Sequence, residues 1–208
     1  MKKDRVLMCL FLILFIIITI FVMTDTISSF DRAIYNFLIS FRNYRLDAFF
    51  KTITMFANTI TVIIITILLL IALKRKEQFM LLTVVISTVG VNQILKHIIR
   101  RARPEHLRLI KETGFSYPSG HAMISIALYG FMIYYIYQNV RNKYLKIIMI
   151  SFLSVLIVAI GCSRIYVGVH YPSDVLGGYL LSFTILMAVI NFYNNHFRGD
   201  LYGKNGSK

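Results

Sequence analysis

The sequence predicts an all-α protein, a polytopic membrane helical bundle with six transmembrane helices and an amphipathic helix at the outer interface. Of its 208 residues, 57% are hydrophobic and only 15% are charged, unlike an average soluble domain. Apolar stretches recur along the chain at close to the length that crosses roughly 30 Å of bilayer hydrocarbon. Charged or turn-forming residues bound each stretch, which is typical of a multi-pass membrane protein.

The apolar stretches place the six spans at residues 6–23, 54–73, 79–99, 119–137, 145–161 and 175–192. The first span follows Lys2, Lys3 and Arg5, as the apolar part of a secretory signal would. Its apolar run is too long for a signal, and the residues at its end are not the small ones of a cleavage site. We therefore expect a retained helix.

Residues 27–41, between the first two spans, show helical periodicity. Apolar side chains recur there at steps of three and four residues, at Ile27, Phe30, Ile34, Phe37, Leu38 and Phe41. Polar residues fill the positions between them. This pattern predicts an amphipathic helix that lies at the outer interface, packs on the rest of the protein, or does both.

The formal net charge is +14, which in a soluble protein would indicate nucleic-acid binding. Here the basic residues are divided among short loops, so we expect no nucleic-acid partner. Four basic clusters fall on one side of the six-span arrangement, at Lys2/Lys3/Arg5, Lys74/Arg75/Lys76, Arg141/Lys143/Lys146 and Arg198/Lys204/Lys208. The positive-inside rule makes that side cytoplasmic, with both termini on it, in the cell membrane.

No repeat, low-complexity tract or flexible linker divides the chain, so residues 1–208 are expected to form a single integral-membrane domain. Cations on the translocated side work against the insertion preference. Six of them surround the loop after the third span, at Lys96, Arg100, Arg101, Arg103, Arg108 and Lys111. Function is the best explanation for this concentration.

The first of three outer clusters pairs Lys96 with Arg103. The two are seven residues apart, which on a helix puts them on nearly the same face, roughly 10 Å apart. Two long cationic side chains so placed can converge on one anion. Pro104 disfavours helical geometry at Arg103, so the helix is expected to end there and the guanidinium to fold inward. Alone, this pair is more typical of cations that snorkel to a membrane surface.

The second cluster is Pro118-Ser119-Gly120-His121, at the start of the fourth span. Proline suits a first helical turn, and glycine allows a ligand to approach exposed backbone N–H groups. Ser119 adds a hydroxyl donor, and His121 is placed to exchange a proton with the same anion. A helix start with an incidental histidine explains this tetrapeptide about as well.

The third cluster, Ser163-Arg164 followed by His170 and Asp174, spans the turn between the last two spans. If a helix begins near Pro172, the Asp174 carboxylate can reach one ring nitrogen of His170 and leave the other as a nucleophile. Arg164 can clamp phosphate oxygens through two N–H groups. A structural hydrogen bond is the commoner role of an isolated His/Asp pair, but the neighbouring arginine weakens that reading.

Together the clusters resemble the tripartite signature of the type 2 phosphatidic acid phosphatase superfamily, in its membrane lipid phosphatase branch; vanadium haloperoxidases are related members. The eleven matching positions are Lys96-x6-Arg103-Pro104, Pro118-Ser119-Gly120-His121 and Ser163-Arg164-x5-His170-x3-Asp174. The signature lies within residues 96–174, and the six spans extend the resemblance over most of the chain.

The resemblance implies a role for each matching side chain. His170 would attack phosphorus to form a phosphohistidine, Asp174 would orient it, and His121 would protonate the leaving alkoxide and later help to activate water. The phosphoryl group would be bound by Lys96, Arg103, Ser119, the Gly120 backbone and Arg164. Fixed cations and donors suit a transition state whose charge is spread over equatorial oxygens. The resemblance implies neither a metal nor another cofactor.

The predicted function is removal of a terminal phosphomonoester or diphosphate from a membrane lipid. Phosphatidylglycerophosphate, phosphatidic acid and undecaprenyl diphosphate all qualify, and no residue distinguishes their head groups. Because a lipid chain gains about 0.8 kcal/mol per buried CH₂, we expect the substrate to enter laterally, with residues 27–41 as a wall or gate. The high Lys, Ile and Asn content is typical of a bacterial protein, and no protein partner is indicated.

Two other functions compete with this prediction. A vanadate-dependent haloperoxidase would use the same anion pocket, but six spans and a short chain argue against it. A non-catalytic protein that binds or transports anionic lipids could use Asn92 and Gln93 to line a path, although helix packing explains them as well. A protein that only binds lipids needs no oriented His/Asp pair with a second histidine, so these residues favour the phosphatase over the binding protein.

Overall fold

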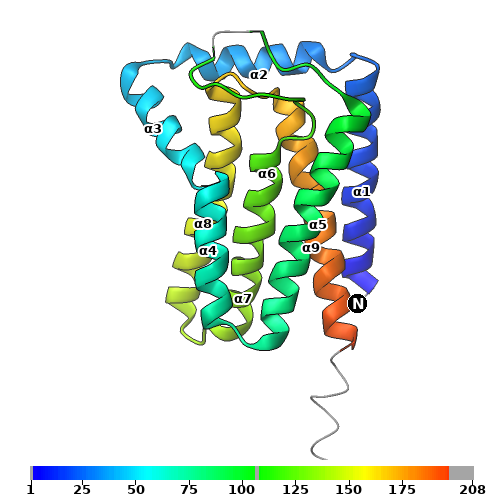
Figure 1. Cartoon of the computed structure of the whole chain (residues 1–208), viewed down its shortest axis with the longest axis vertical. Coiled ribbons are helices and arrows are strands. Elements are labelled where there is room, and N and C mark those ends of the chain that lie inside the picture. The colour runs from blue at the N-terminus through cyan, green and yellow to red at the C-terminus, as the bar shows by residue number, and fades with distance from the viewer. Residues whose placement is uncertain (1, 106–107, 197–208) are drawn as a thin grey trace, which may run out of the picture.

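Helices are the only regular elements in the computed structural model, which describes residues 2–105 and 108–196 (Figure 1). The all-α prediction is therefore confirmed. In chain order the elements are α1 (Lys2–Met23), α2 (Ser28–Ser40), α3 (Tyr44–Met55), α4 (Thr59–Ala72), α5 (Arg75–Ile99), α6 (Gly120–Ser125), the π-helix η1 (Ile126–Gly130), α7 (Phe131–Asn139), α8 (Lys143–Tyr166) and α9 (Pro172–His196).

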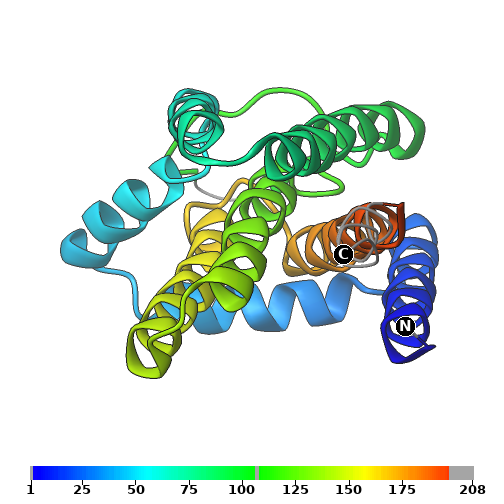
Figure 2. The same cartoon turned by 90° about the horizontal axis from the view of Figure 1, so that it is seen from below.

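Five stretches are long and apolar enough to cross a membrane, as expected for a multi-pass protein. They are α1, α5, the continuous α6–η1–α7 segment, α8 and α9. The α6–η1–α7 segment is the most buried of the five. Figure 2 shows α1 packed along α9 at the edge of the bundle.

The second predicted span, residues 54–73, is wrong at its start. α4 has 14 residues, about 21 Å of helix, and reaches span length only together with α3, which is bent from it by 47°. Two contacts fix the break. The Asn58 side chain accepts a hydrogen bond from the Thr61 N–H at 2.8 Å and so starts a new helix. The Tyr129 hydroxyl donates to the Phe56 carbonyl at 2.6 Å.

The amphipathic helix predicted at residues 27–41 is present as α2, which lies across one end of the bundle (Figure 1). The large apolar side chains of Phe37 in α2 and of Phe41 at its C-cap are exposed, whereas Asp31 is buried. A helix at the membrane interface would be expected to point its apolar side chains at lipid. The burial of Asp31 instead directs one charge toward the protein, where it must be paired.

The α2 end of the bundle also carries residues 100–105 and 108–119 and the turn between α8 and α9 (Figure 1). The start of α1, the α4–α5 turn and the α7–α8 turn lie at the other end. Three of the four basic clusters thus share one end, as predicted. The fourth, at Arg198/Lys204/Lys208, falls outside the described residues.

Candidate active site

His170 and Asp174 meet at the α2 end, one in the turn after α8 and the other in the first turn of α9. His170 Nδ1 lies 3.3 Å from Asp174 Oδ2, and both side chains are buried. An ionised carboxylate only accepts hydrogen bonds, so the ring proton belongs on Nδ1 and the lone pair on Nε2. The four-residue spacing therefore produces the oriented imidazole that the sequence predicts.

Burial lowers the pKa of His170 to about 4, and the positive charges of Arg164 and Arg103 act in the same direction. The Asp174 carboxylate opposes this shift without overcoming it. The imidazole is therefore neutral at pH 7, as a nucleophile must be. Its Nε2 lies 3.3 Å from Arg103 Nη1, which donates toward the lone pair.

Asp174 is held by groups that the sequence did not single out. Its Oδ2 accepts from the Tyr171 N–H at 2.8 Å and from the Ser116 hydroxyl, and its Oδ1 accepts from Arg101 Nη1 at 2.6 Å. With four donors counting His170, this buried carboxylate is well compensated. Arg101 appears in the sequence only as one of several outer cations, and Ser116 carries no signal.

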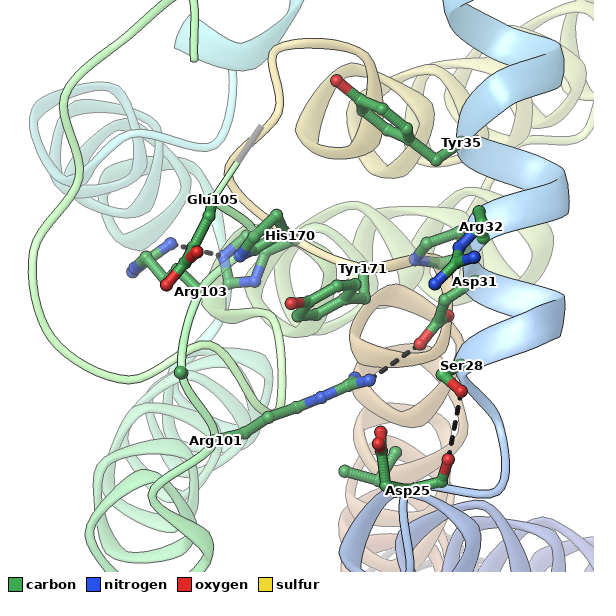
Figure 3. A pocket seen from close by; sticks show the side chains of 14 residues that line it. Asp25, Ser28, Asp31, Arg32, Tyr35, Arg101, Arg103, Glu105, His170 and Tyr171 are labelled. Atoms are coloured by element: carbon green, nitrogen blue, oxygen red, sulfur yellow. Dashed lines mark hydrogen bonds and ion pairs between the residues drawn. The ribbon is translucent and has the colours of Figure 1, made fainter. Parts of the chain in front are cut away.

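Arg101 also ties the site to α2 (Figure 3). Its Nη2 donates to Asp31 Oδ2 at 2.7 Å, and its guanidinium lies 4.1 Å from the centre of the Tyr171 ring. Asp31 in turn accepts from the backbone N–H of Ser173 at 2.8 Å and from the hydroxyl of the same residue at 2.7 Å. The buried charge on α2 is thus paired, and it connects the amphipathic helix to Asp174.

Arg103 reaches the site by a different route from the predicted one. α5 ends at Ile99, and Arg100 caps it in the left-handed region with φ of 51°. Arg103 therefore lies in the loop and does not share a helix face with Lys96, because the helix ends before Pro104 can act. The Arg103 side chain nevertheless points into the protein, as expected. Its guanidinium donates hydrogen bonds to the carbonyls of Gly114, Thr113 and Val169 at 2.9–3.0 Å.

Arg164 lies on the last turn of α8, whereas the sequence placed it in the turn beyond. Its side chain is only 1% exposed. Nη1 donates to Thr54 Oγ1 at 2.6 Å, Nη2 donates to the Glu112 carboxylate, and Nε has no partner among the described residues. The α3–α4 break brings Thr54 to this position, so the misplaced span contributes to the site.

The Pro118-to-His121 turn is pinned from two sides. Asn92 Nδ2 donates to the Pro118 carbonyl at 2.9 Å, which supports the packing explanation for Asn92, and the Ser119 N–H donates to the Asp174 carbonyl at 3.0 Å. A side chain at Gly120 would begin 3.2 Å from Asn92 Oδ1, so glycine fits this close approach. The Ser119 hydroxyl is fully buried and has no partner among the described residues.

Ser119 Oγ and Arg164 Nε are thus buried donors without a partner among the described residues, and both belong to the predicted phosphate-binding set. Buried donors are normally satisfied, and an anion such as phosphate would satisfy both. Lys96 and His121 line one cavity together with Glu112, whose carboxylate pairs with Arg164 and lies 3.8 Å from Arg103 Nη2. Across the described residues, no three His, Cys, Asp or Glu side chains come together as metal ligands do.

The two histidines line different cavities. His121 lines one of about 360 Å³ that runs between α4 and α5 past Val62 and Val89 to Lys96. His170 lines one of about 490 Å³ with polar walls that include Asp31 and other residues of α2 (Figure 3). α2 therefore borders the cavity of His170, whereas α4 and α5 border that of His121. The expected role of residues 27–41 as a wall or gate of the lipid entrance stays a prediction.

The sequence model of the PAP2 superfamily matches residues 78–198. The chain is 36% identical to phosphatidylglycerophosphatase B of Bacillus subtilis (strain 168) over 104 residues, which is 49% of this chain and 51% of that protein. It is 32% identical to an undecaprenyl-diphosphatase of Sulfolobus acidocaldarius over 125 residues, 56% of each chain. The matches thus span about half the length of these curated relatives.

Two solved structures resemble this fold, one over nearly all of the chain and the other over about three quarters of it. The first transmembrane PAP2 type phosphatidylglycerolphosphate phosphatase from Bacillus subtilis superposes with a TM-score of 0.80 at 28% identity, covering 94% of this chain and 98% of that one. Aquifex aeolicus LpxE superposes with a TM-score of 0.65 at 19% identity, covering 76% of this chain and 93% of that one, and shows a shared fold.

Proposed function

The chain belongs to the PAP2 superfamily, and on this premise we propose that it is a phosphatase acting on a terminal phosphomonoester or diphosphate of a membrane lipid. The observation that carries the proposal is the oriented pair of His170 and Asp174 beside a cation cluster with two unpaired donors. We propose that the site is formed by the residues that the sequence predicts, which are His170, His121, Asp174, Lys96, Arg103, Ser119, Gly120 and Arg164; the contacts of His170 with Asp174 and Arg103 support this assignment.

In the first step, Nε2 of His170 forms a bond to phosphorus while the bond from phosphorus to the lipid oxygen breaks. His121 gives its proton to the leaving oxygen, and Asp174 stabilises the positive charge that develops on the His170 ring. In the second step His121 removes a proton from water, the water oxygen bonds to phosphorus, and the phosphorus–nitrogen bond breaks. Phosphate leaves, and both histidines return to their starting states.

Lys96, Arg103 and Arg164 neutralise the charge of the phosphoryl group in both steps, the task that Mg²⁺ performs in many other phosphoryl-transfer enzymes. The unpaired Ser119 hydroxyl and the backbone at Gly120 would complete the anion site. We propose that the enzyme needs no metal, because side chains supply the positive charge.

The cavity between α4 and α5 supports a lipid substrate. It begins among apolar side chains of the two helices and ends at Lys96 and His121, so a head group could reach the cations while its chains stay in hydrocarbon. Extraction of those chains into water would cost about 0.8 kcal/mol per CH₂. The relatives are named for phosphatidylglycerophosphate and undecaprenyl diphosphate, and both are candidate substrates here.

Purified protein in mixed micelles should release phosphate from at least one of phosphatidylglycerophosphate, phosphatidic acid and undecaprenyl diphosphate. We expect this activity to persist in excess chelator, and orthovanadate to inhibit it because vanadate can mimic five-coordinate phosphorus. Loss of activity in chelator, restored by a divalent metal, would contradict the proposed site. A halide peroxidase assay with added vanadate tests the haloperoxidase alternative, for which we expect no activity.

We further propose that the active site faces the outer side of the cell membrane, with the basic turns in the cytoplasm. Lys111 lies in the loop at the site end, and Lys143 begins α8 at the other end. In a protein without Cys9 and Cys162, an impermeant thiol reagent should label Lys111→Cys in intact cells, but Lys143→Cys only after permeabilisation. The opposite labelling pattern would invert the topology and place the site on the cytoplasmic leaflet.

A further inference from the structure

Glu112, in the loop segment of residues 108–119, extends its carboxylate to Arg164 and Arg103. It accepts a hydrogen bond from Arg164 Nη2, and its other oxygen lies 3.8 Å from Arg103 Nη2. It also lines the cavity between α4 and α5 together with Lys96 and His121. No motif in the sequence contains Glu112, and the proposed reaction does not use it.

The Arg164 guanidinium shows what this contact blocks. Planar guanidinium groups bind phosphate through two parallel N–H groups on one edge. Nη1 already donates a hydrogen bond to Thr54. The edge left for an anion consists of Nε, which has no partner among the described residues, and Nη2, which donates to Glu112. A phosphoryl group that takes this edge in full must displace the carboxylate.

Glu112 is suited to being displaced. Its side chain is 28% exposed, against 1% for Arg164, so it can move into water while the arginine stays in place. Burial would raise its pKa, but Arg164 and Arg103 outweigh this effect and hold the pKa below its usual value, so the group is ionised at neutral pH. As an ionised carboxylate tethered beside the cluster, it competes at a high effective concentration.

We propose that Glu112 is a specificity-determining residue that occupies the phosphate subsite before substrate binds and admits only doubly charged phosphoryl groups. A terminal phosphomonoester carries about −1.5 to −2 charges at pH 7 and can outcompete one carboxylate. A phosphodiester head group of an ordinary membrane phospholipid carries a single charge and cannot. Glu112 thus keeps the surrounding bilayer lipids from inhibiting the enzyme. This inference rests on the proposed function.

The test compares Glu112→Gln with Glu77→Gln, which removes the same charge from the first turn of α5, at the end of the bundle away from the site. With Glu112→Gln we expect the inhibition constants of inorganic phosphate and orthovanadate to fall about tenfold, allowing for the partial exposure of the ion pair. We also expect phosphatidylglycerol, a phosphodiester, to become a competitive inhibitor. Glu77→Gln should behave like the wild type in all three measurements.

Unchanged or weaker inhibition of Glu112→Gln would overturn the inference, because a carboxylate that merely braces the arginines would weaken anion binding when removed. Glu112→Asp provides a second variant that keeps the charge but shortens the side chain. Its inhibition constants should lie between those of the wild type and those of Glu112→Gln. Thermal stabilisation by orthovanadate gives a readout without turnover. Stronger stabilisation of Glu112→Gln, with no lipid hydrolysis by the wild type, would support the subsite and reject the proposed function.

Discussion

His170→Ala is expected to abolish phosphate release from lipid substrates, by about 10⁵-fold or more, because it removes the nucleophile itself. The cavity that His170 lines and the cluster of cations would remain, so the variant should still bind orthovanadate. The loss is measured as phosphate release over hours. A dilution series of the wild-type enzyme, assayed in the same way, defines the lowest rate that can be detected.

The matched control for this variant is His97→Ala. His97 is exposed on α5, one residue after Lys96, and its ring contacts only the Gln93 carbonyl and the edge of Phe115 among the described residues. It should retain wild-type activity. Gel filtration and thermal unfolding in detergent must show that both variants are folded, since His170 is buried and its loss leaves Arg103 Nη1 with one partner fewer. A folded His170→Ala protein with normal turnover would refute the mechanism.

His121→Ala should lower activity by about 10²- to 10⁴-fold, the usual contribution of a general acid or base. The defect should depend on the leaving group. Phosphatidic acid releases a strongly basic alkoxide that needs the proton, whereas a lipid diphosphate releases a lipid phosphate that needs it much less. We therefore expect a larger defect with phosphatidic acid when both activities are compared with wild type.

Equal defects with the two lipids would assign His121 to binding or to the second step alone. His121→Gln separates these cases further, because glutamine keeps a hydrogen-bond donor but transfers no proton. If glutamine restores activity to near the wild-type rate, His121 acts by positioning the phosphoryl group and not as an acid.

Local sequence spacing predicted the parts of the fold and site that depend on one segment. The long apolar helices and α2 follow from hydrophobic periodicity, and the contact between His170 and Asp174 follows from their four-residue separation. The break before α4 could not be predicted this way, because the apolar pattern runs through it. It depends on the Asn58 cap and on a hydrogen bond from Tyr129, which is 73 residues from Phe56.

The residues missed in the site are those that act across long sequence separations. Arg101 meets Asp31 across 70 residues and Asp174 across 73, and Glu112 meets Arg164 across 52. Nothing in their local sequence pairs them. The same limit explains why Lys96 and Arg103 were placed on one helix face, since the sequence near Pro104 did not show that α5 ends at Ile99.

Direct detection of the phosphohistidine tests the central claim most sharply. His121→Ala protein should be mixed with a lipid diphosphate that carries a labelled terminal phosphate, because its leaving group needs little protonation in the first step. Samples should be denatured in alkali at successive times, because phosphohistidine hydrolyses in acid, and digested for mass spectrometry. The account predicts label on His170 that appears before free phosphate and is absent when His170 is also replaced. Label on any other residue, or phosphate release by the double variant at the rate of His121→Ala, would contradict it.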